Sequence, residues 1–429
     1  MLSANLDPMA ATSQTHEGNS EHAPLDRPAP ANVQGAGKLI VPTSYAAGYA
    51  KARNVDRKVA DNYIRHTTIG DAELDPVMEE LAELPPKQMH RFIRAGIEQD
   101  DNETLRSAPQ IMRDFFNNYE VPDWVDFDEF KPGQSAFFSN MSNMLIAYAI
   151  GSAVEGFSTL VSKSFSITGR VSGLGPGAVR RLRQNNRHMV ETYFPNGMKR
   201  DGEGWKVTMR IRFVHARMRK LLADSDLWDH DAWGTPLSAA HVGGIALYTF
   251  SIRQFEHAMA MGSKITEEER SSIVKIWRYG GSVIGVPEGI LFTNEAEARQ
   301  LYEIGHLCEP PPDDDALSVA SSVFKAIPEM AGVKTEAERK SLQLYAFRLS
   351  RALIGNKLAD QYGYPNTIRS RNLVLSYYRL RSRIANLLTK SWLLQEQSFT
   401  QIFDATQYDK EGISYRMPDH VRATQQSPW

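Results

Sequence analysis

One histidine and two arginines recur at helical spacing within residues 205–222. Arg212 lies three residues before His215, and Arg219 lies four residues after it. Residues three and four positions apart lie on the same side of a helix, so both guanidinium groups would flank the imidazole. A ring nitrogen of histidine can bind a metal, and arginine pairs with carboxylates. The spacing therefore favours a site for an anion beside an imidazole.

The segment that carries these residues contains two conflicting patterns. Residues 207–213 alternate apolar and polar side chains, which is typical of a strand. However, residues 205–222 contain no Gly, Pro or Asn, and the second half fits only a helix. A helix places His215 at the edge of an apolar arc formed by Val207, Ile211, Val214, Met218, Leu221 and Leu222. The basic residues that would point away from this arc are Arg210, Arg217 and Lys220. We therefore predict a helix over 205–222.

This geometry matches a flat, apolar ligand that carries carboxylates and accepts an imidazole, and haem has these properties. His215 would bind the iron, and Arg212 and Arg219 would pair with the propionates or organise the pocket. In the alternative interpretation, His215 is an ordinary core histidine and the arginines pair with Asp or Glu from other helices. The residues alone leave both interpretations open.

Composition restricts the class of protein. The 429 residues include 49 Lys and Arg against 51 Asp and Glu, so no excess of positive charge points to nucleic acid or an anionic membrane. The single cysteine, Cys308, excludes an internal disulfide and suits a reducing compartment. No secretory signal is recognised, and we expect a cytoplasmic protein. Residues 132–154 carry no charge, but their first half is too polar for a bilayer, so we predict a buried helix and no transmembrane segment.

Most of the remaining chain has helical periodicity interrupted by Pro and Gly, which predicts an all-α fold. The expected helices are 75–84, 87–98, 139–163, 180–193, 237–260, 266–279, 294–306, 314–327, 336–361 and 366–389. Residues 1–44 are rich in Ala, Pro, Ser, Asn and Gly, and we predict that they are disordered.

An ordered series of motifs resembles the latex clearing protein family, which comprises rubber oxygenases and ER-bound oxygenases of the MpaB type. The matching motifs are Val121-Pro-Asp-Trp124, Glu155, Thr168-Gly-Arg170, Arg212-Phe-Val-His-Ala-Arg-Met-Arg219, Trp233-Gly-Thr-Pro-Leu237, Trp277-Arg-Tyr-Gly-Gly281 and Gly285-Val-Pro-Glu288. The resemblance extends over about residues 115–395. We accordingly expect a helical extension at 45–114, an oxygenase-like catalytic domain at 115–395 and a tail at 396–429.

The resemblance implies a single, globin-like helical domain that binds haem b without covalent attachment and uses dioxygen on an unsaturated substrate. It places the proximal ligand at His215, the flanking arginines at Arg212 and Arg219, a distal-side arginine at Arg170 and a catalytic glutamate at Glu155. Rubber oxygenases carry a lysine three residues after the distal arginine. Because Gly173 stands there, we expect the sixth iron position to be open or filled by water. A prenyl, terpenoid or other lipid-like molecule is a more plausible hydrophobic substrate than rubber, because a polymer cannot enter a cell.

The resemblance also assigns Glu155 the removal of a proton from the substrate, and burial in an apolar helix should raise its pKa. The alternative for Glu155 is a buried salt bridge to Arg170. Two other hypotheses for the protein stay open: a haem- or lipid-binding protein without oxygenase turnover, and a helical scaffold without a cofactor. We expect no ligand role for the other histidines: His241 and His257 as core or surface residues, and His188 on a solvated helix face.

Overall fold

The computed structural model describes residues 39–169, 176–366, 371–388, 417–418 and 420–422. Every regular element in these residues is helical, which confirms the predicted all-α class. The α-helices of the first half are α1 (Ala46–Val55), α2 (Arg57–His66), α3 (Asp75–Ala82), α4 (Pro86–Glu98), α5 (Asn102–Arg106), α6 (Gln110–Asn117), α7 (Lys131–Ser139), α8 (Met141–Ala147), α9 (Ala153–Gly156), α10 (Val161–Thr168) and α11 (Pro176–Tyr193). Those of the second half are α12 (Glu203–Ala223), α13 (His230–Trp233), α14 (Leu247–Phe250), α15 (Ile252–Ala260), α16 (Glu267–Val283), α17 (Glu295–Cys308), α18 (Asp314–Met330), α19 (Glu336–Ile354), α20 (Asn356–Gln361) and α21 (Arg371–Leu388). Short 3-10 turns are η1 (Thr43–Tyr45), η2 (Phe127–Phe130) and η5 (Glu288–Ile290), and π-helical segments are η3 (Tyr148–Ser152) and η4 (Ala240–Ala246).

The long helix α12 confirms the prediction for residues 205–222. It is surrounded by α3, α4, α11 and α16, so neighbouring helices cover most of its circumference. This explains the misleading alternation of residues 207–213, because a helix that is covered on several sides buries residues outside a single stripe. Arg212 and Arg219 are themselves buried.

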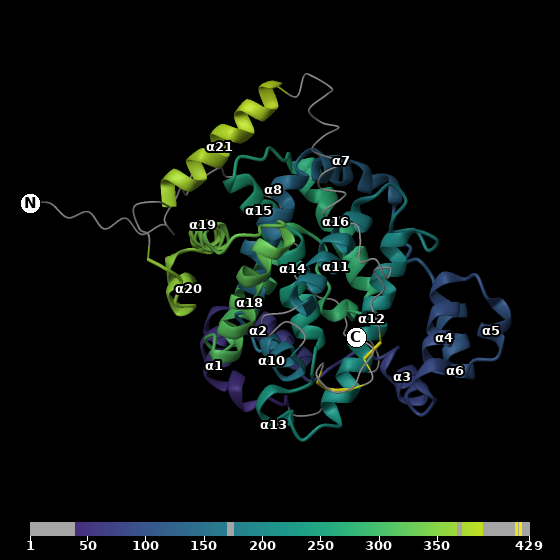
Figure 1. Ribbon diagram of the computed structural model, residues 1–429. Helices are drawn as coiled ribbons and strands as arrows, with labels where there is room; N and C mark the ends of the chain where they lie inside the picture. Colours follow the sequence, from purple (N-terminus) through teal and green to yellow (C-terminus); the bar gives the residue numbers. More distant parts are fainter. Residues whose placement is uncertain (1–38, 170–175, 367–370, 389–416, 419, 423–429) are drawn as a thin grey trace, which may run out of the picture.

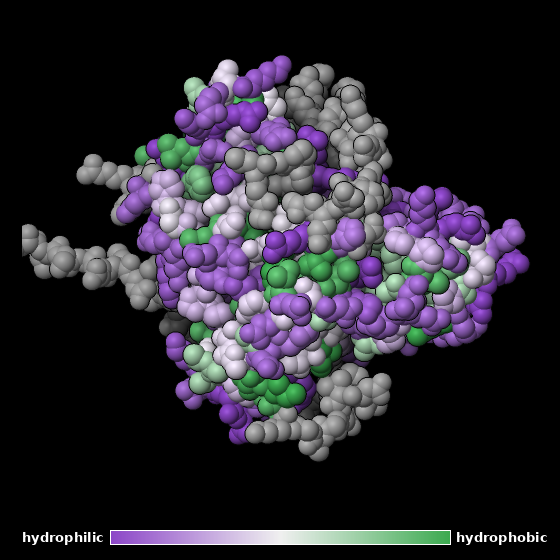
Figure 2. Space-filling view, turned by 60° about the horizontal axis from the view of Figure 1, so that its bottom comes forward, coloured by the Kyte–Doolittle hydropathy of each residue, from purple (hydrophilic) through white to green (hydrophobic). Residues whose placement is uncertain are grey.

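One hydrophobic core extends from Tyr45 to Met417, so α1 and α2 share the core of the later helices. Helices α4, α5 and α6 form a lobe at the right of the molecule (Figure 1), and this core continues into them through Phe92 of α4 and Phe116 of α6. The surface of this lobe is largely hydrophilic in the rotated view (Figure 2). The helices of the predicted extension 45–114 therefore contribute to the same core as the later helices, and the last three of them also project as a lobe.

The predicted single helix over 139–163 is wrong. The chain forms α8, then the π-helical η3 and α9, and turns before α10 begins at Val161. In that turn the hydroxyls of Ser158 and Thr159 donate to the carbonyls of Glu155 and Gly156, and these local bonds compete with helix continuation. Among the described residues no single helix has the length and apolarity to cross a membrane; the pair Met141–Gly156 and Val161–Thr168 meets these criteria only jointly and is bent by 100°.

Some predictions concern residues outside the described ranges. Of the segment 1–44 that we predicted to be disordered, only 39–44 are described, and the last two of these residues already belong to η1. Arg170 and Gly173 lie outside the described residues, as does most of the predicted tail 396–429.

Candidate functional site

A cavity of about 210 Å³ lies between α9, α10, α11, α12, η4 and α14. Most of its wall is apolar, with Phe157, Ile211, Val214, Ile245 and Phe250 among the lining residues. A cavity of about 150 Å³ lined by Leu, Ile and Phe holds benzene, so this one has room for a larger apolar ligand. Both π-helical segments contribute to the wall, and such segments are frequent at functional sites.

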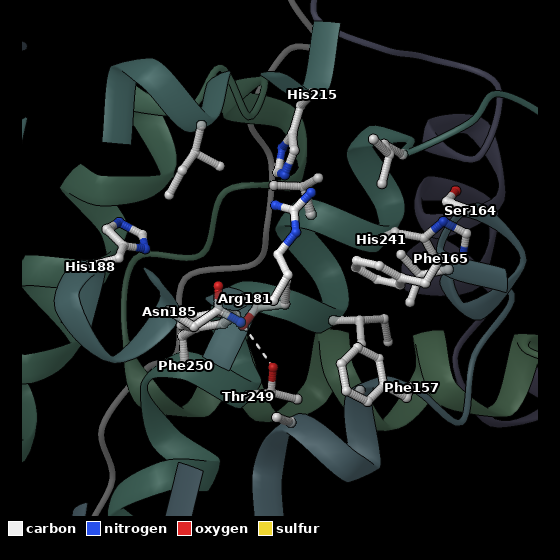
Figure 3. Close-up of a pocket in the computed structure, with 18 of the residues that line it drawn as sticks. Phe157, Ser164, Phe165, Arg181, Asn185, His188, His215, His241, Thr249 and Phe250 are labelled. Carbon is white, nitrogen blue, oxygen red and sulfur yellow. Dashed lines mark hydrogen bonds between the residues drawn. The ribbon is translucent and has the colours of Figure 1, made fainter. Parts of the chain in front are cut away.

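His215 projects from α12 into this cavity (Figure 3). Burial, together with the positive charges of Arg219 and Arg181, lowers the pKa of His215 from 6.5 to about 3. The ring is therefore neutral at physiological pH. No described residue forms a hydrogen bond with it. A neutral imidazole that opens onto an apolar cavity can bind a metal through a ring nitrogen.

The guanidinium of Arg212 binds carboxylates of the chain itself. Its Nε donates to Asp71 Oδ2 at 2.6 Å, and its Nη2 donates to Asp71 Oδ1 and to Glu73 Oε2, each at 2.8 Å. Gly285 makes room for this pair: a Cβ there would lie 2.1 Å from Asp71 Oδ2, and the backbone φ of +86° also favours glycine. The motif Gly285-Val-Pro-Glu288 therefore has a structural role beside α12.

Arg219 makes a second ion pair of the same kind. Its Nε and Nη2 donate to the carboxylate of Asp75 at 2.7 to 2.9 Å. Its Nη1 donates to the carbonyl of Leu237 at 2.9 Å, and Leu237 lines the cavity with a positive φ of 47°. Arg219 thereby holds the end of the Trp233–Leu237 motif in a strained conformation.

The structure thus places both arginines on acidic residues, which is the alternative that the sequence left open. Neither is among the described residues that line the cavity. A contribution of Arg212 and Arg219 to cofactor binding stays a prediction, and it would act by positioning α12 and its histidine.

Glu155 differs from expectation in both its pKa and its partner. Arg253 Nε and Nη2 donate to its carboxylate at 2.6 and 2.7 Å, and His257 Nε2 lies 3.2 Å from Oε2. Burial alone would raise the pKa of Glu155, but the charges of His257 and Arg253 and their hydrogen bonds outweigh it and lower the pKa to about 2. The predicted rise of the pKa is therefore wrong, because no local pattern indicated Arg253 as a partner of Glu155.

The position of Glu155 relative to the cavity follows from these contacts. Its neighbours Ala153 and Gly156 line the cavity, whereas Glu155 is not among the described lining residues. To accept a proton from a ligand in the cavity, its carboxylate would have to leave Arg253. Its catalytic role, like that of Arg170, stays a prediction.

Three residues at the cavity carried no functional prediction from the sequence. Arg181 of α11 extends toward His215, and His188 and His241 belong to the opposite parts of the wall (Figure 3). The expectation that His188 is solvated is wrong: it is buried, its Nε2 lies 3.0 Å from Thr208 Oγ1, and burial lowers its pKa to about 4. The available signal in the sequence was spacing: Asn185 lies four residues after Arg181, and His188 lies three residues after Asn185, which places all three along one side of a helix.

His241 belongs to a buried polar network behind the cavity wall. Its Nε2 lies 3.1 Å from both the Tyr45 hydroxyl and Glu309 Oε1. Glu309 also accepts hydrogen bonds from the Tyr63 hydroxyl at 2.6 Å and from the backbone N–H of Leu160 at 2.9 Å. Burial opposes ionisation of Glu309, but the charge of His241 and these bonds keep its pKa below the ordinary value. The network joins α2 and η1 to the cavity wall.

The donor set of the cavity fits the haem that the sequence suggested. It offers one neutral imidazole, apolar walls for a flat ring, and one guanidinium for a carboxylate. By contrast, the described residues contain no group of three or more His, Cys, Asp or Glu that could hold a metal ion by themselves. A porphyrin with one axial histidine is therefore the metal group that these side chains suit.

Comparisons with known proteins agree with this architecture. A search of curated proteins gives no match. Among solved structures, latex clearing protein in its closed state matches with a TM-score of 0.63 at 17% sequence identity, covering 82% of this chain and 95% of the other. A family model described as ER-bound oxygenase mpaB/B'/rubber oxygenase, catalytic domain, matches residues 138–386, more than half of the chain. The chain therefore belongs to the family of mpaB-type and rubber oxygenases.

Proposed function

We propose that the protein is a haem b-dependent oxygenase that uses dioxygen to oxidise an unsaturated, lipid-like molecule such as a prenyl or terpenoid alkene. The observation that carries this proposal is the neutral imidazole of His215, which opens onto an apolar cavity. Family membership supports the oxygenase class. It does not specify the substrate, which we infer from the apolar wall.

Each residue at the site would have a distinct role in the proposed reaction. His215 would hold the haem iron. The bound haem would supply the activation of dioxygen for attack on a carbon–carbon double bond, and cleavage to two carbonyl products is the outcome we propose. Phe157, Ile245 and Phe250 would hold the substrate by apolar contact and exclude water. Arg212 and Arg219, through their ion pairs, would keep α12 in register with the cavity.

The first experiment is an absorption spectrum of the purified protein after titration with hemin. We expect a Soret band in the wild type and in His230→Ala, and its loss in His215→Ala. His230 is a suitable control because it is exposed and its Nε2 contacts only the Ala223 carbonyl among the described residues. A wild-type protein that stays colourless, or a His215→Ala variant that keeps the band, would refute the proposed site.

A second candidate function is haem or lipid binding without oxygenase turnover. The engagement of Glu155 by Arg253 favours it, because that carboxylate is not available as a base in the described conformation. Oxygen consumption by the haem-loaded protein distinguishes the oxygenase from the binding protein. Uptake with an alkene but not with the corresponding saturated compound supports the oxygenase, and no uptake with a range of prenyl and terpenoid alkenes supports the binding protein.

A further inference from the structure

Helix α21 lies on the outer rim of the molecule and exposes large apolar side chains (Figure 1). Leu373, Tyr377 and Leu380 are 71%, 57% and 56% exposed. They are spaced four and three residues apart, so they form one stripe along the helix, which we call the α21 stripe. Single apolar residues on a surface are ordinary, whereas a contiguous apolar patch typically marks a contact with a protein partner or a lipid. The exposed face of α21 is therefore a candidate interaction surface.

The opposite face of α21 is attached to α19 and to the end of α15. Leu375 and Tyr378 are buried, and the ring of Tyr378 stacks on Tyr345 of α19 with 6.5 Å between the ring centroids. Ser382 Oγ donates to the carbonyl of Met261, just after α15, at 3.2 Å. These contacts fix the rotation of α21 about its own axis, so the α21 stripe points away from the core.

Positive charge flanks the α21 stripe. The chain as a whole has a net charge of −2, but the sequence of α21 contains four arginines and no acidic residue. At about 100° per residue, Arg379 and Arg381 lie on opposite sides of the stripe. Both are exposed, and neither is paired with a carboxylate among the described residues. An apolar stripe between arginines is typical of a helix that lies in a membrane interface, with its apolar face among the lipids and its cations at the headgroups.

The charge of α21 also indicates which partner suits the stripe. In a symmetric pair of chains, two α21 stripes placed face to face would bring their arginines together with no acidic residue of α21 to balance them. An anionic bilayer supplies both complements: apolar lipid for the stripe, and phosphates, which guanidinium groups bind well. Basic residues on an amphipathic helix are accordingly typical of binding to anionic lipids.

We infer that α21 binds the surface of a membrane that contains anionic lipids. Leu373, Tyr377 and Leu380 would contact the lipid, and Arg379 and Arg381 would bind headgroup phosphates. This inference does not rest on the proposed oxygenase function. The two are compatible in their chemistry, because a lipid-like substrate would be dissolved in the same bilayer.

The test is co-sedimentation of the full-length protein with two kinds of vesicle: phosphatidylcholine alone, and equal parts of phosphatidylcholine and phosphatidylserine. The apolar variant is Tyr377→Ser/Leu380→Ser. Its control is Leu227→Ser, which removes an exposed leucine just before α13, at the other end of the molecule (Figure 1). Thermal unfolding confirms that each variant is folded, and the single variant Leu380→Ser replaces the double one should that fail.

The charge variant is Arg379→Gln/Arg381→Gln, and Arg381→Gln alone is the second choice. Its control is Lys87→Gln/Arg91→Gln, which removes two exposed cations from α4 in the lobe far from α21 (Figure 1). Control and charge variant lose the same net charge, so a difference between them reports the position of the charge.

We expect the wild type and both controls to bind the mixed vesicles, and to bind them less at high salt because salt screens the headgroup charge. The apolar variant should bind about tenfold more weakly or less, since burial of one large apolar side chain is worth a factor of about ten or more. The charge variant should bind about 25-fold more weakly, because each cation near an anionic surface contributes a factor of about five.

Wild-type protein that does not sediment with the mixed vesicles would refute the inference, as would variants of α21 that bind as tightly as their controls. Equal binding to vesicles with and without phosphatidylserine would refute the requirement for anionic lipid. Size-exclusion chromatography tests for a protein partner instead: a wild-type dimer that Tyr377→Ser/Leu380→Ser dissociates, without binding to either vesicle, would make the α21 stripe a contact between copies of the chain. None of these results depends on haem, so hemin titration tests the proposed function separately.

Discussion

Replacing Glu155 by Gln tests whether its ion pair with Arg253 stabilises the fold. Glu155 is 5% exposed, and the guanidinium of Arg253 donates to both carboxylate oxygens, at 2.6 and 2.7 Å. A pKa lowered from 4.5 to about 2 corresponds to about 3 kcal/mol of stability at neutral pH. Removing one member of a buried pair typically costs about 3–5 kcal/mol, because the other charge stays buried. We therefore expect Glu155→Gln to lower the free energy of unfolding by about 3 kcal/mol at pH 7.

The pH dependence of this loss follows from the direction of the pKa change. The folded carboxylate has a lower pKa than the unfolded one, so its contribution is complete above about pH 4.5 and disappears as the pH falls toward 2. The wild type should thus lose stability in that interval, whereas Glu155→Gln has no such group to protonate. The difference between the two proteins should narrow as the pH decreases below 4.5.

Urea unfolding followed by circular dichroism measures both effects. Glu256→Gln is the comparison variant, because Glu256 binds Nη1 of the same Arg253 at 2.9 Å and Arg299 at 2.6 Å, but its side chain is 21% exposed. We expect it to cost less than Glu155→Gln, because solvent screens a partly exposed pair. Equal losses in the two variants, or a loss in Glu155→Gln that does not change between pH 7 and pH 3, would contradict the assigned ion pair.

Three further predictions concern stability. Burial lowers the pKa of His188 from 6.5 to about 4, so the unfolded chain binds a proton at this residue at a higher pH than the folded chain does. The free energy of unfolding of the wild type should therefore fall between pH 6.5 and pH 4, and it should fall less in His188→Gln when both are measured by urea unfolding. An equal fall in the two proteins would be contrary evidence. Arg212→Ala should lower the free energy of unfolding by about 3 kcal/mol or more, because it leaves the buried carboxylate of Asp71 without its cation. Arg217→Ala, which removes a donor to the Pro418 carbonyl, should cost less, and similar values would argue against the pairing with Asp71. Glu309→Gln should lower the free energy of unfolding by about 3 kcal/mol and Tyr63→Phe by about 1 kcal/mol in the same assay. Among the described residues, the carboxylate bonds to several partners and the phenol to one, and the reverse order would refute this account of the network.

The sequence predicted α12 and its histidine because local spacing contains that information. An arc of apolar residues and the positions of Arg212, His215 and Arg219 depend only on helical geometry. The partners of these residues depend on the packing of other helices. Asp71 lies 141 residues before Arg212, and nothing in the local pattern indicates which carboxylate reaches it. The sequence therefore left open whether these arginines bind a cofactor or acidic residues of the chain.

Glu155 shows why a pKa is harder to predict than a helix. Apolar neighbours in the sequence suggested desolvation alone, and desolvation raises the pKa of a carboxyl group. Arg253 and His257 come from α15, about a hundred residues later, and reverse the direction. The prediction that His188 is solvated was wrong for a related reason. The arginines near it in the sequence suggested an exposed helix face, but His188 is buried.

The ion pairs and the polar network together set a limit on how far the chain can be trimmed. The stretch that matches the family begins at residue 138, yet the counter-ions of Arg212 and Arg219 lie at Asp71 and Asp75, and one hydroxyl of the Glu309 network lies at Tyr63. A fragment cut to 138–386 would therefore hold buried cations without counter-ions and should aggregate on expression. Crystallisation or mutational libraries that need a shorter version of this protein should keep α2 and α3.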